Sequence, residues 1–174
     1  MPRVIGRRVL CRGRRMVFGQ VLADLGGREV WFDALLHGGA VAVLAVEGGR
    51  VLLERQFRPV IGEWIYEIPA GTIEEGEEPV ETARRELVEE TGYEPARLTH
   101  LLTIYPSPGT STERIHVFLA EDLRYRGARL EEDEAIETLW VPLSEALEMI
   151  RRGDIRDAKT IVALLYYSAL HRGS

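Results

Sequence analysis

The alternation of apolar and polar residues along the chain predicts several short strands and few helices. Residues 3–36 predict three strands, Arg3–Cys11, Met16–Leu25 and Arg28–Leu36, with Gly26-Gly27 as a hairpin turn. His37-Gly38-Gly39 then marks a boundary, and the continuous apolar run Ala40–Val46 predicts a strand buried on both faces. The further predicted strands are Val51–Phe57, Glu63–Ile68, Leu98–Tyr105, Ile115–Ala120 and Ile136–Val141.

Three helices are predicted from end signals and helical spacing. Pro79 at a first helical position and Gly92 just past the end bracket a helix over 79–91. Ser144–Arg151 is a short amphipathic helix stopped by Gly153, and Asp157 suits the cap of a last helix. The apolar positions of that last helix are Ile161, Leu164, Leu165 and Ala169. Strands mixed with a few helices predict a layered α/β (α+β) sandwich.

Composition places the chain among globular proteins and leaves few other classes open. Apolar residues make up 45% and charged residues 29%. The longest apolar runs fall short of the roughly 18 residues that a membrane span needs. The N-terminus has no apolar core followed by a small-residue cleavage site, so we expect no export. A single cysteine, Cys11, excludes an internal disulfide and a cysteine-built zinc site, and we expect a cytoplasmic protein.

The net charge of −6 disfavours nucleic acid as a partner, and its distribution is uneven. Between Gly71 and Tyr93 eight glutamates face only Arg84 and Arg85, so this segment carries the whole net charge. Before Met16 the only charged residues are arginines, namely Arg3, Arg7, Arg8, Arg12, Arg14 and Arg15. These arginines could bind RNA, or they could lie on an exposed edge strand, where charged side chains prevent pairing with other chains. We favour the edge strand.

The acidic helix predicted over 79–91 carries the clearest chemical signal. Glu86, Glu89 and Glu90 stand at i, i+3 and i+4, which places three carboxylates on one face within a turn. The apolar stripe toward the core would consist of Val80, Ala83 and Leu87. Carboxylates so close repel one another, and hard oxygen ligands of this kind suit Mg²⁺ or Mn²⁺. The alternative is a solvated acidic face on which Arg85 pairs with Glu89.

The wider pattern decides between these alternatives. The chain runs Gly71-x5-Glu77-x7-Arg85-Glu86-Leu87-x-Glu89-Glu90-x-Gly92-Tyr93. This resembles the Nudix box, the signature of hydrolases that cleave nucleoside diphosphates linked to another moiety. Every fixed position of the box is present, and Tyr93 alone departs from the aliphatic residue that is usual there.

The resemblance implies a role for each matching residue. In the family the box forms a loop–helix–loop within an α/β/α sandwich with a mixed β-sheet. The implied metal ligands are Glu86, Glu89, Glu90 and the backbone carbonyl of Ala70. Arg85 would orient a helix carboxylate and, with Glu89, belongs to the implied catalytic set. Glu77 would support the loop, while Gly71 and Gly92 would form tight turns that a Cβ obstructs.

Features outside the box resemble the ADP-ribose pyrophosphatase subgroup. The subgroup's substrate loop would correspond to residues 106–114, with Pro108, Gly109 and Glu113 as substrate contacts. Arg55 and Arg58 would contact the diphosphate, where arginine suits bidentate recognition. Ordinary alternatives are a Pro-Gly turn for the loop and strand-edge charge for the two arginines.

The subgroup also implies a base and a second subunit. A glutamate on the loop 124–134 would activate water, and Glu134 aligns best, with Glu132 as the alternative. An N-terminal β extension, residues 1–38, would precede the Nudix domain at 39–174, form a small antiparallel sheet and swap between two subunits. Trp31 or Phe18 would stack on adenine. Both could equally be core residues of the small sheet, and we favour core packing for Phe18.

We therefore expect a homodimeric, Mg²⁺-dependent hydrolase that cleaves ADP-ribose to AMP and ribose 5-phosphate, with Mn²⁺ as an alternative cofactor. The partners expected are a nucleoside diphosphate sugar and a second copy of the chain, without nucleic acid or membrane. Two other substrates stay open, another nucleotide sugar such as GDP-mannose and oxidised nucleoside triphosphates. A function of another class is also possible, that of a non-catalytic module that senses ADP-ribose.

Overall fold

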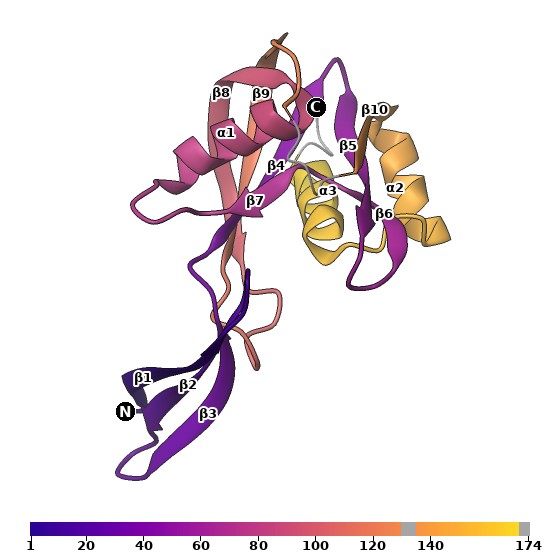
Figure 1. The fold of residues 1–174 in the computed structure, drawn as a ribbon. Coiled ribbons are helices and arrows are strands. Elements are labelled where there is room, and N and C mark those ends of the chain that lie inside the picture. Colours follow the sequence, from indigo (N-terminus) through magenta and orange to yellow (C-terminus); the bar gives the residue numbers. More distant parts are fainter. Residues whose placement is uncertain (130–134, 171–174) are drawn as a thin grey trace. The chain divides into compact units, whose positions relative to one another are not determined.

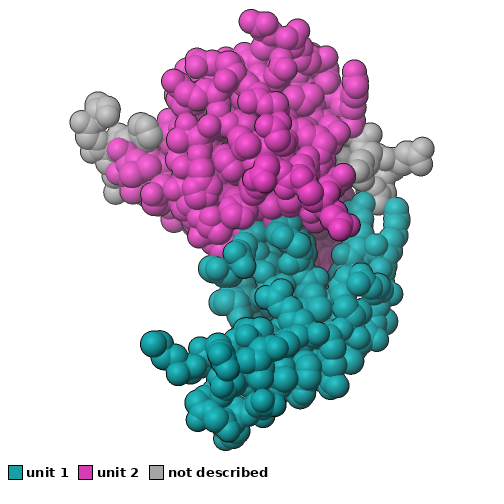
Figure 2. Space-filling model, turned by 90° about the vertical axis from the view of Figure 1, so that its left-hand side faces the viewer, with its two compact units in different colours: residues 1–39, 105–114 teal, residues 40–104, 115–174 magenta. Residues whose placement is uncertain are grey.

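The computed structural model describes residues 1–129 and 135–170 of the chain. These form two compact units, residues 1–39 with 105–114 and residues 40–104 with 115–174 (Figure 2). The sequence analysis had left residues 105–114 in the second domain. They belong to the first unit because the Leu35 amide donates to the Thr110 carbonyl at 2.9 Å and the Thr112 amide donates to the Leu35 carbonyl at 3.0 Å.

The first unit is built on a three-stranded antiparallel sheet in the order β1-β2-β3 (Figure 1). Its strands are β1 (Arg3–Arg12), β2 (Val17–Asp24) and β3 (Glu29–Leu36). Gly26 and Gly27 both have positive φ, which lets the chain turn tightly between β2 and β3. The small antiparallel sheet expected from the sequence is confirmed.

The second unit holds a mixed seven-stranded sheet whose main path runs β10-β5-β4-β9-β8, with β6 beside β5 and β7 beside β4. The strands are β4 (Ala40–Glu47), β5 (Arg50–Arg58), β6 (Glu63–Glu67), β7 (Ala70–Thr72), β8 (Tyr93–Ile104), β9 (Ile115–Tyr125) and β10 (Ile136–Pro142). Strands β4 and β9 are parallel and the other pairs are antiparallel. The mixed sheet predicted for this class of fold is confirmed.

Helices cover both faces of this sheet (Figure 1). The helix α1 (Pro79–Thr91) packs on one face, where Ala83 and Leu87 contact the side chains of Val41 and Val43. The helices α2 (Leu143–Arg152) and α3 (Ala158–Leu170) pack on the other face. Strand β4 lies between the layers with residues 41–45 at 0% exposure, as its continuous apolar run predicted.

Three strands differ clearly from the sequence prediction. Strand β9 continues to Tyr125, beyond the predicted end at Ala120. Strand β7 was missed, since three residues after Pro69 give no alternation to detect. Strand β8 begins at Tyr93 instead of Leu98 and contains Pro95. A proline is tolerated there because β8 is the edge strand of the main path. Among the residues that the structure describes, no helix has the length and apolar character needed to cross a membrane.

Candidate metal centre and active site

The buried face of α1 differs from the predicted stripe at one position. Ala83 and Leu87 are fully buried, but Val80 is 38% exposed. Thr82 lies on the buried face instead, where its hydroxyl donates to the carbonyl of Glu78 at 3.3 Å. This intrahelical bond allows a polar side chain to be buried at that point. The inclusion of Val80 in the core stripe was therefore wrong.

Two of the predicted metal-ligating glutamates of α1 lie beside β7. The Ala70 amide donates to Oε2 of Glu90 at 3.0 Å, and Glu90 is only 5% exposed. Glu86 lies over Gly71, since a Cβ built on Gly71 would stand 1.9 Å from Oε1 of Glu86. Glu89 is more open, with 42% of its side chain exposed, and it binds Arg85. The structure thus brings the carboxylates of Glu86 and Glu90 to the short strand that carries the carbonyl of Ala70.

Arg85 holds the acidic side chains together. Its Nε and Nη2 donate to the two carboxylate oxygens of Glu77, each at 3.0 Å. Its Nη1 donates to Glu86 Oε1 at 2.9 Å and to Glu89 Oε2 at 3.1 Å. The hydrogen bond with Glu77 raises the pKa of Arg85, so this guanidinium stays charged. One cation therefore bridges the loop before α1 and two carboxylates on the helix.

Replacing Glu77 by glutamine is expected to lower the free energy of unfolding in a pH-dependent way. The hydrogen bond from Arg85 lowers the pKa of Glu77 from 4.5 to about 2. A carboxyl with a depressed folded-state pKa contributes stability that is complete above 4.5 and is lost as the pH falls through about 2. Urea unfolding at a series of pH values should show the difference between wild type and Glu77→Gln shrinking over this range. A difference that does not change with pH would contradict this explanation.

The donor chemistry of the cluster suits a hard divalent cation. Glu86, Glu89, Glu90 and the Ala70 carbonyl all offer oxygen, which Mg²⁺ and Mn²⁺ prefer. The space over Gly71 that a Cβ would fill is occupied by the Glu86 carboxylate. In residues 1–129 and 135–170 no three acidic, histidine or cysteine side chains are already arranged around one point as metal ligands. The reason lies in the present contacts, because Arg85 binds Glu86 and Glu89 while Glu90 binds the Ala70 amide.

Arg55 and Arg58, the two arginines of β5 predicted to contact the diphosphate, lie on opposite faces of the sheet. Arg58 binds Glu67 through a bidentate ion pair, with Nε at 2.6 Å and Nη2 at 2.8 Å. The hydrogen bond with Glu67 and, more weakly, the charge of Glu90 raise the pKa of Arg58. Arg55 and Leu53 are two residues apart and so point to the same face of β5, the one that α2 and α3 cover. There the guanidinium of Arg55 lies 4.8 Å from the ring centre of Trp64. The structure thus brings only Arg58 to the α1 face.

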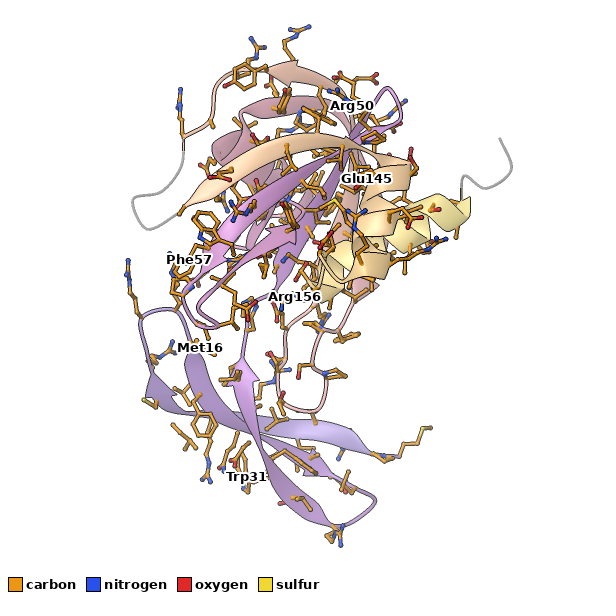
Figure 3. The ribbon with its side chains drawn as sticks, turned by 90° about the vertical axis from the view of Figure 1, so that its right-hand side faces the viewer. Met16, Trp31, Arg50, Phe57, Glu145 and Arg156 are labelled. Atoms are coloured by element: carbon orange, nitrogen blue, oxygen red, sulfur yellow. The ribbon has the colours of Figure 1, made fainter. Side chains whose placement is uncertain are left out.

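The remaining predicted substrate contacts belong to the first unit. Trp31, labelled in Figure 3, is 40% exposed. The guanidinium carbon of Arg8 lies 4.3 Å from the centre of its ring. Pro108 and Gly109 lie in an exposed loop, and Glu113 is half-buried with its amide donating to the Ser111 hydroxyl. Phe18 is 41% exposed, so packing in a core does not account for it. Glu134 and Glu132, the predicted base and its alternative, lie outside the described residues.

Residues 35–164 match the family model of the NUDIX domain. The chain belongs to the Nudix family. It is 47% identical over 137 residues to an ADP-ribose pyrophosphatase of Bacillus subtilis (strain 168), covering 77% of this chain and 74% of that relative. It is 38% identical over 145 residues to a GDP-mannose pyrophosphatase of Escherichia coli (strain K12), covering 78% and 75%. The predicted family is confirmed, and the chain is a Nudix hydrolase.

A solved structure supports the same fold. The crystal structure of an ADP compounds hydrolase matches with a TM-score of 0.83 over 99% of this chain and 95% of that chain. At 21% sequence identity this likeness shows the Nudix fold alone. Nudix hydrolases generally use divalent metal ions, in keeping with the oxygen donors gathered beside β7.

Sequence reasoning missed two charged residues that are linked to Arg58. Glu67 is 2% exposed and joins Arg58, and Lys159 of α3 also donates to it. Two signals were available in the sequence. Lys159 is the single lysine of the chain, and alternation along Glu63–Ile68 places Glu67 on the face opposite Tyr66. The pairing across 92 residues could not be read locally.

Proposed function

We propose that this Nudix hydrolase cleaves the diphosphate bond of ADP-ribose in a Mg²⁺-dependent reaction that releases AMP and ribose 5-phosphate. The chemistry rests on the carboxylates of Glu90 beside Ala70 and of Glu86 beside Gly71, together with that of Glu89, which Arg85 joins to Glu86. The proposed substrate rests on one observation, the 47% identity to an ADP-ribose pyrophosphatase over 77% of the chain.

Each residue has a separate task in this proposal. Glu86, Glu89, Glu90 and the Ala70 carbonyl would hold Mg²⁺, with Mn²⁺ as the alternative. When bound, such a cation neutralises charge on a diphosphate and makes water a better nucleophile. Arg85 orients the Glu86 and Glu89 carboxylates through its hydrogen bonds to both.

Arg58 is proposed to bind the diphosphate, and this gives the two arginines of β5 different expected effects. Arg58→Ala should lower kcat/KM by about 100-fold, since it removes charged hydrogen bonds to the substrate. Arg55→Ala should change kcat/KM by less than about threefold, because Arg55 lies on the opposite face of the sheet. Steady-state kinetics on both variants, with thermal unfolding as a check of folding, measures this. Equal losses in the two variants would remove Arg58 from its proposed role.

A substrate panel decides between ADP-ribose and its nearest alternative. The 38% identity to a GDP-mannose pyrophosphatase makes GDP-mannose the second candidate. We expect kcat/KM for ADP-ribose to exceed that for GDP-mannose by at least about tenfold, since the two nucleobases differ in hydrogen-bonding groups. The reverse order would assign the chain to GDP-mannose. Tight binding of ADP-ribose without turnover in Mg²⁺ would favour a sensor.

We further propose a homodimer that is assembled through the first unit. Its three-stranded sheet exposes large apolar side chains, more than an isolated small sheet leaves in water without a partner. These are Val4, Ile5, Val9, Leu10, Met16, Phe18, Leu25, Trp31 and Phe32. Trp31 is our candidate for stacking on adenine, and Pro108, Gly109 and Glu113 for further substrate contacts. Sedimentation equilibrium should give twice the mass of the chain, and a monomer would overturn the dimer.

We also propose that the protein is located in the cytoplasm, in keeping with its single free cysteine.

A further inference from the structure

Glu67 is a buried carboxylate held by two cations from distant parts of the chain. Its two oxygens accept hydrogen bonds from Nε and Nη2 of Arg58 at 2.6 and 2.8 Å. Oε2 also accepts a hydrogen bond from Nζ of Lys159. Glu67 is 2% exposed and the Lys159 side chain 12%, whereas Arg58 keeps 40% of its side chain exposed. Glu67 and Lys159 are therefore held in the interior, while the Arg58 side chain reaches the solvent.

Lys159 is itself fixed by the start of α3. Its Nζ lies 3.2 Å from Oδ1 of Asp157. As predicted, Asp157 caps the helix, because its Oδ2 accepts from the amide and the hydroxyl of Thr160 at 2.9 and 2.6 Å. Thr160 Oγ1 in turn accepts from the Ile68 amide at 2.9 Å. One helix start therefore holds both the Glu67 carboxylate and the residue that follows it in the chain.

The ion pair with Glu67 leaves part of the Arg58 guanidinium available. A guanidinium has five N–H donors, and Glu67 takes one from Nε and one from Nη2. The Arg58 side chain donates to no other group within the part of the chain that the structure describes. Three donors are thus left for a ligand on the face where Glu90 lies.

The second cation keeps the Glu67 carboxylate ionised and in place. Burial alone would raise the pKa of Glu67, but the hydrogen bond from Arg58 and then the charge of Lys159 outweigh it and lower the pKa. Asp157 balances the charge of Lys159, so the network holds two cations and two carboxylates. Lys159 therefore affects Arg58 by fixing the carboxylate that Arg58 binds.

We propose that Lys159 is a positioning residue for Arg58. By holding Glu67, it fixes the Arg58 guanidinium in the orientation in which its three remaining donors bind the diphosphate of the substrate. This inference rests on the proposed function, which supplies the diphosphate. Lys159 acts through Arg58 and needs no contact with the substrate itself.

The chain offers a matched control for this network. Arg156, which is labelled in Figure 3, forms an ion pair with Glu63 and so joins the start of β6 to the residues before α3. The pair of Glu67 with Lys159 joins the end of the same strand to the first turn of α3. The pair of Arg156 with Glu63 is exposed at both ends, with 56% and 49% of the side chains accessible. Glu63 lies opposite Arg58 in the β5–β6 register, but no side-chain hydrogen bond or ion pair among the described residues joins Glu63 or Arg156 to Arg58 or Glu67. Arg156→Met therefore removes one cation from the same region and leaves the ion pair between Arg58 and Glu67 in place.

The test is a double-mutant cycle of Lys159→Met with Arg58→Ala, measured as kcat and KM for ADP-ribose at saturating Mg²⁺. Lys159→Met should lower kcat/KM by about tenfold, mainly through KM, in the otherwise wild-type chain. In the Arg58→Ala background the same change should cost less than about twofold, since the group it positions is gone. Arg156→Met should cost less than about twofold in either background. Lys159→Arg keeps the cation and should stay within about threefold of wild type.

A second readout does not depend on turnover. The ¹H–¹⁵N signal of the Arg58 Nε–H, assigned from Arg58→Ala, should shift or broaden in Lys159→Met and stay unchanged in Arg156→Met. An unchanged signal would overturn the proposal. So would an equal loss of kcat/KM with and without Arg58, which would mark Lys159 as merely structural. If the wild type fails to hydrolyse ADP-ribose while the signal still moves, the proposed function fails and the positioning of Arg58 is supported.

Discussion

Glu90→Gln is expected to leave the fold intact and to lower kcat by about 10³-fold, an effect of several kcal/mol. Glu90 is 5% exposed and its Oε2 accepts the Ala70 amide. A glutamine oxygen can still accept that hydrogen bond, so the turn at Ala70 keeps its partner. The substitution removes the negative charge that a divalent cation requires. Steady-state kinetics in Mg²⁺, with circular dichroism and thermal unfolding, measures both consequences.

Glu81→Gln is the matched control for this prediction. Glu81 lies on the same helix, in its exposed first turn, and it faces neither Ala70 nor Gly71 in the contacts described. It should keep kcat within about twofold of wild type. A near-normal rate in Glu90→Gln would remove Glu90 from the proposed ligands. A large loss in Glu81→Gln would show instead that general acidity of the helix matters.

Gly71→Ala is expected to lower kcat by about 10²-fold with only a small change in thermal stability. The new Cβ would stand 1.9 Å from Oε1 and 2.0 Å from Cδ of Glu86. These atoms are the far end of a flexible side chain, so the carboxylate moves aside and the backbone stays in place. The displaced Glu86 carboxylate then no longer lies over Gly71. Kinetics and thermal unfolding together separate this local effect from unfolding.

Gly6→Ala provides the comparison for a glycine with room beside it. A Cβ at Gly6 meets nothing closer than 3.6 Å, an ordinary contact, and Gly6 lies in the first unit. We expect activity and stability close to wild type. If Gly71→Ala proves as active as Gly6→Ala, the position of the Glu86 carboxylate over Gly71 is not needed for the reaction.

Much of the fold follows from local sequence signals. The ends of α1 were predictable because Pro79 suits a helix start and Gly92, at φ 77°, ends the helix in a left-handed conformation. A Cβ at Gly92 would also stand 2.6 Å from the Ala128 amide nitrogen. Strand β7 could not be predicted, because its pairing with β4 is a long-range contact. Pro95 argued against a strand at the start of β8, because proline is tolerated mainly in edge strands. That β8 is an edge strand is known only from the order of the strands in the sheet.

The candidate site was also predictable from the sequence only in part. Helical spacing alone placed Glu86, Glu89 and Glu90 on one face. Strand alternation also contained a signal that was not used. Arg55 and Arg58 are three residues apart and so point to opposite faces of β5. The approach of Lys159 to Glu67 and of Glu86 to Gly71 depends on tertiary packing, and no local pattern encodes it.

Product analysis of purified protein incubated with ADP-ribose, with and without Mg²⁺, tests the central claim most directly. We expect AMP and ribose 5-phosphate in equal amounts with the metal and neither product without it. Folded protein that leaves ADP-ribose intact in Mg²⁺ would contradict the proposed substrate, while the same products formed without any divalent cation would contradict the proposed metal centre.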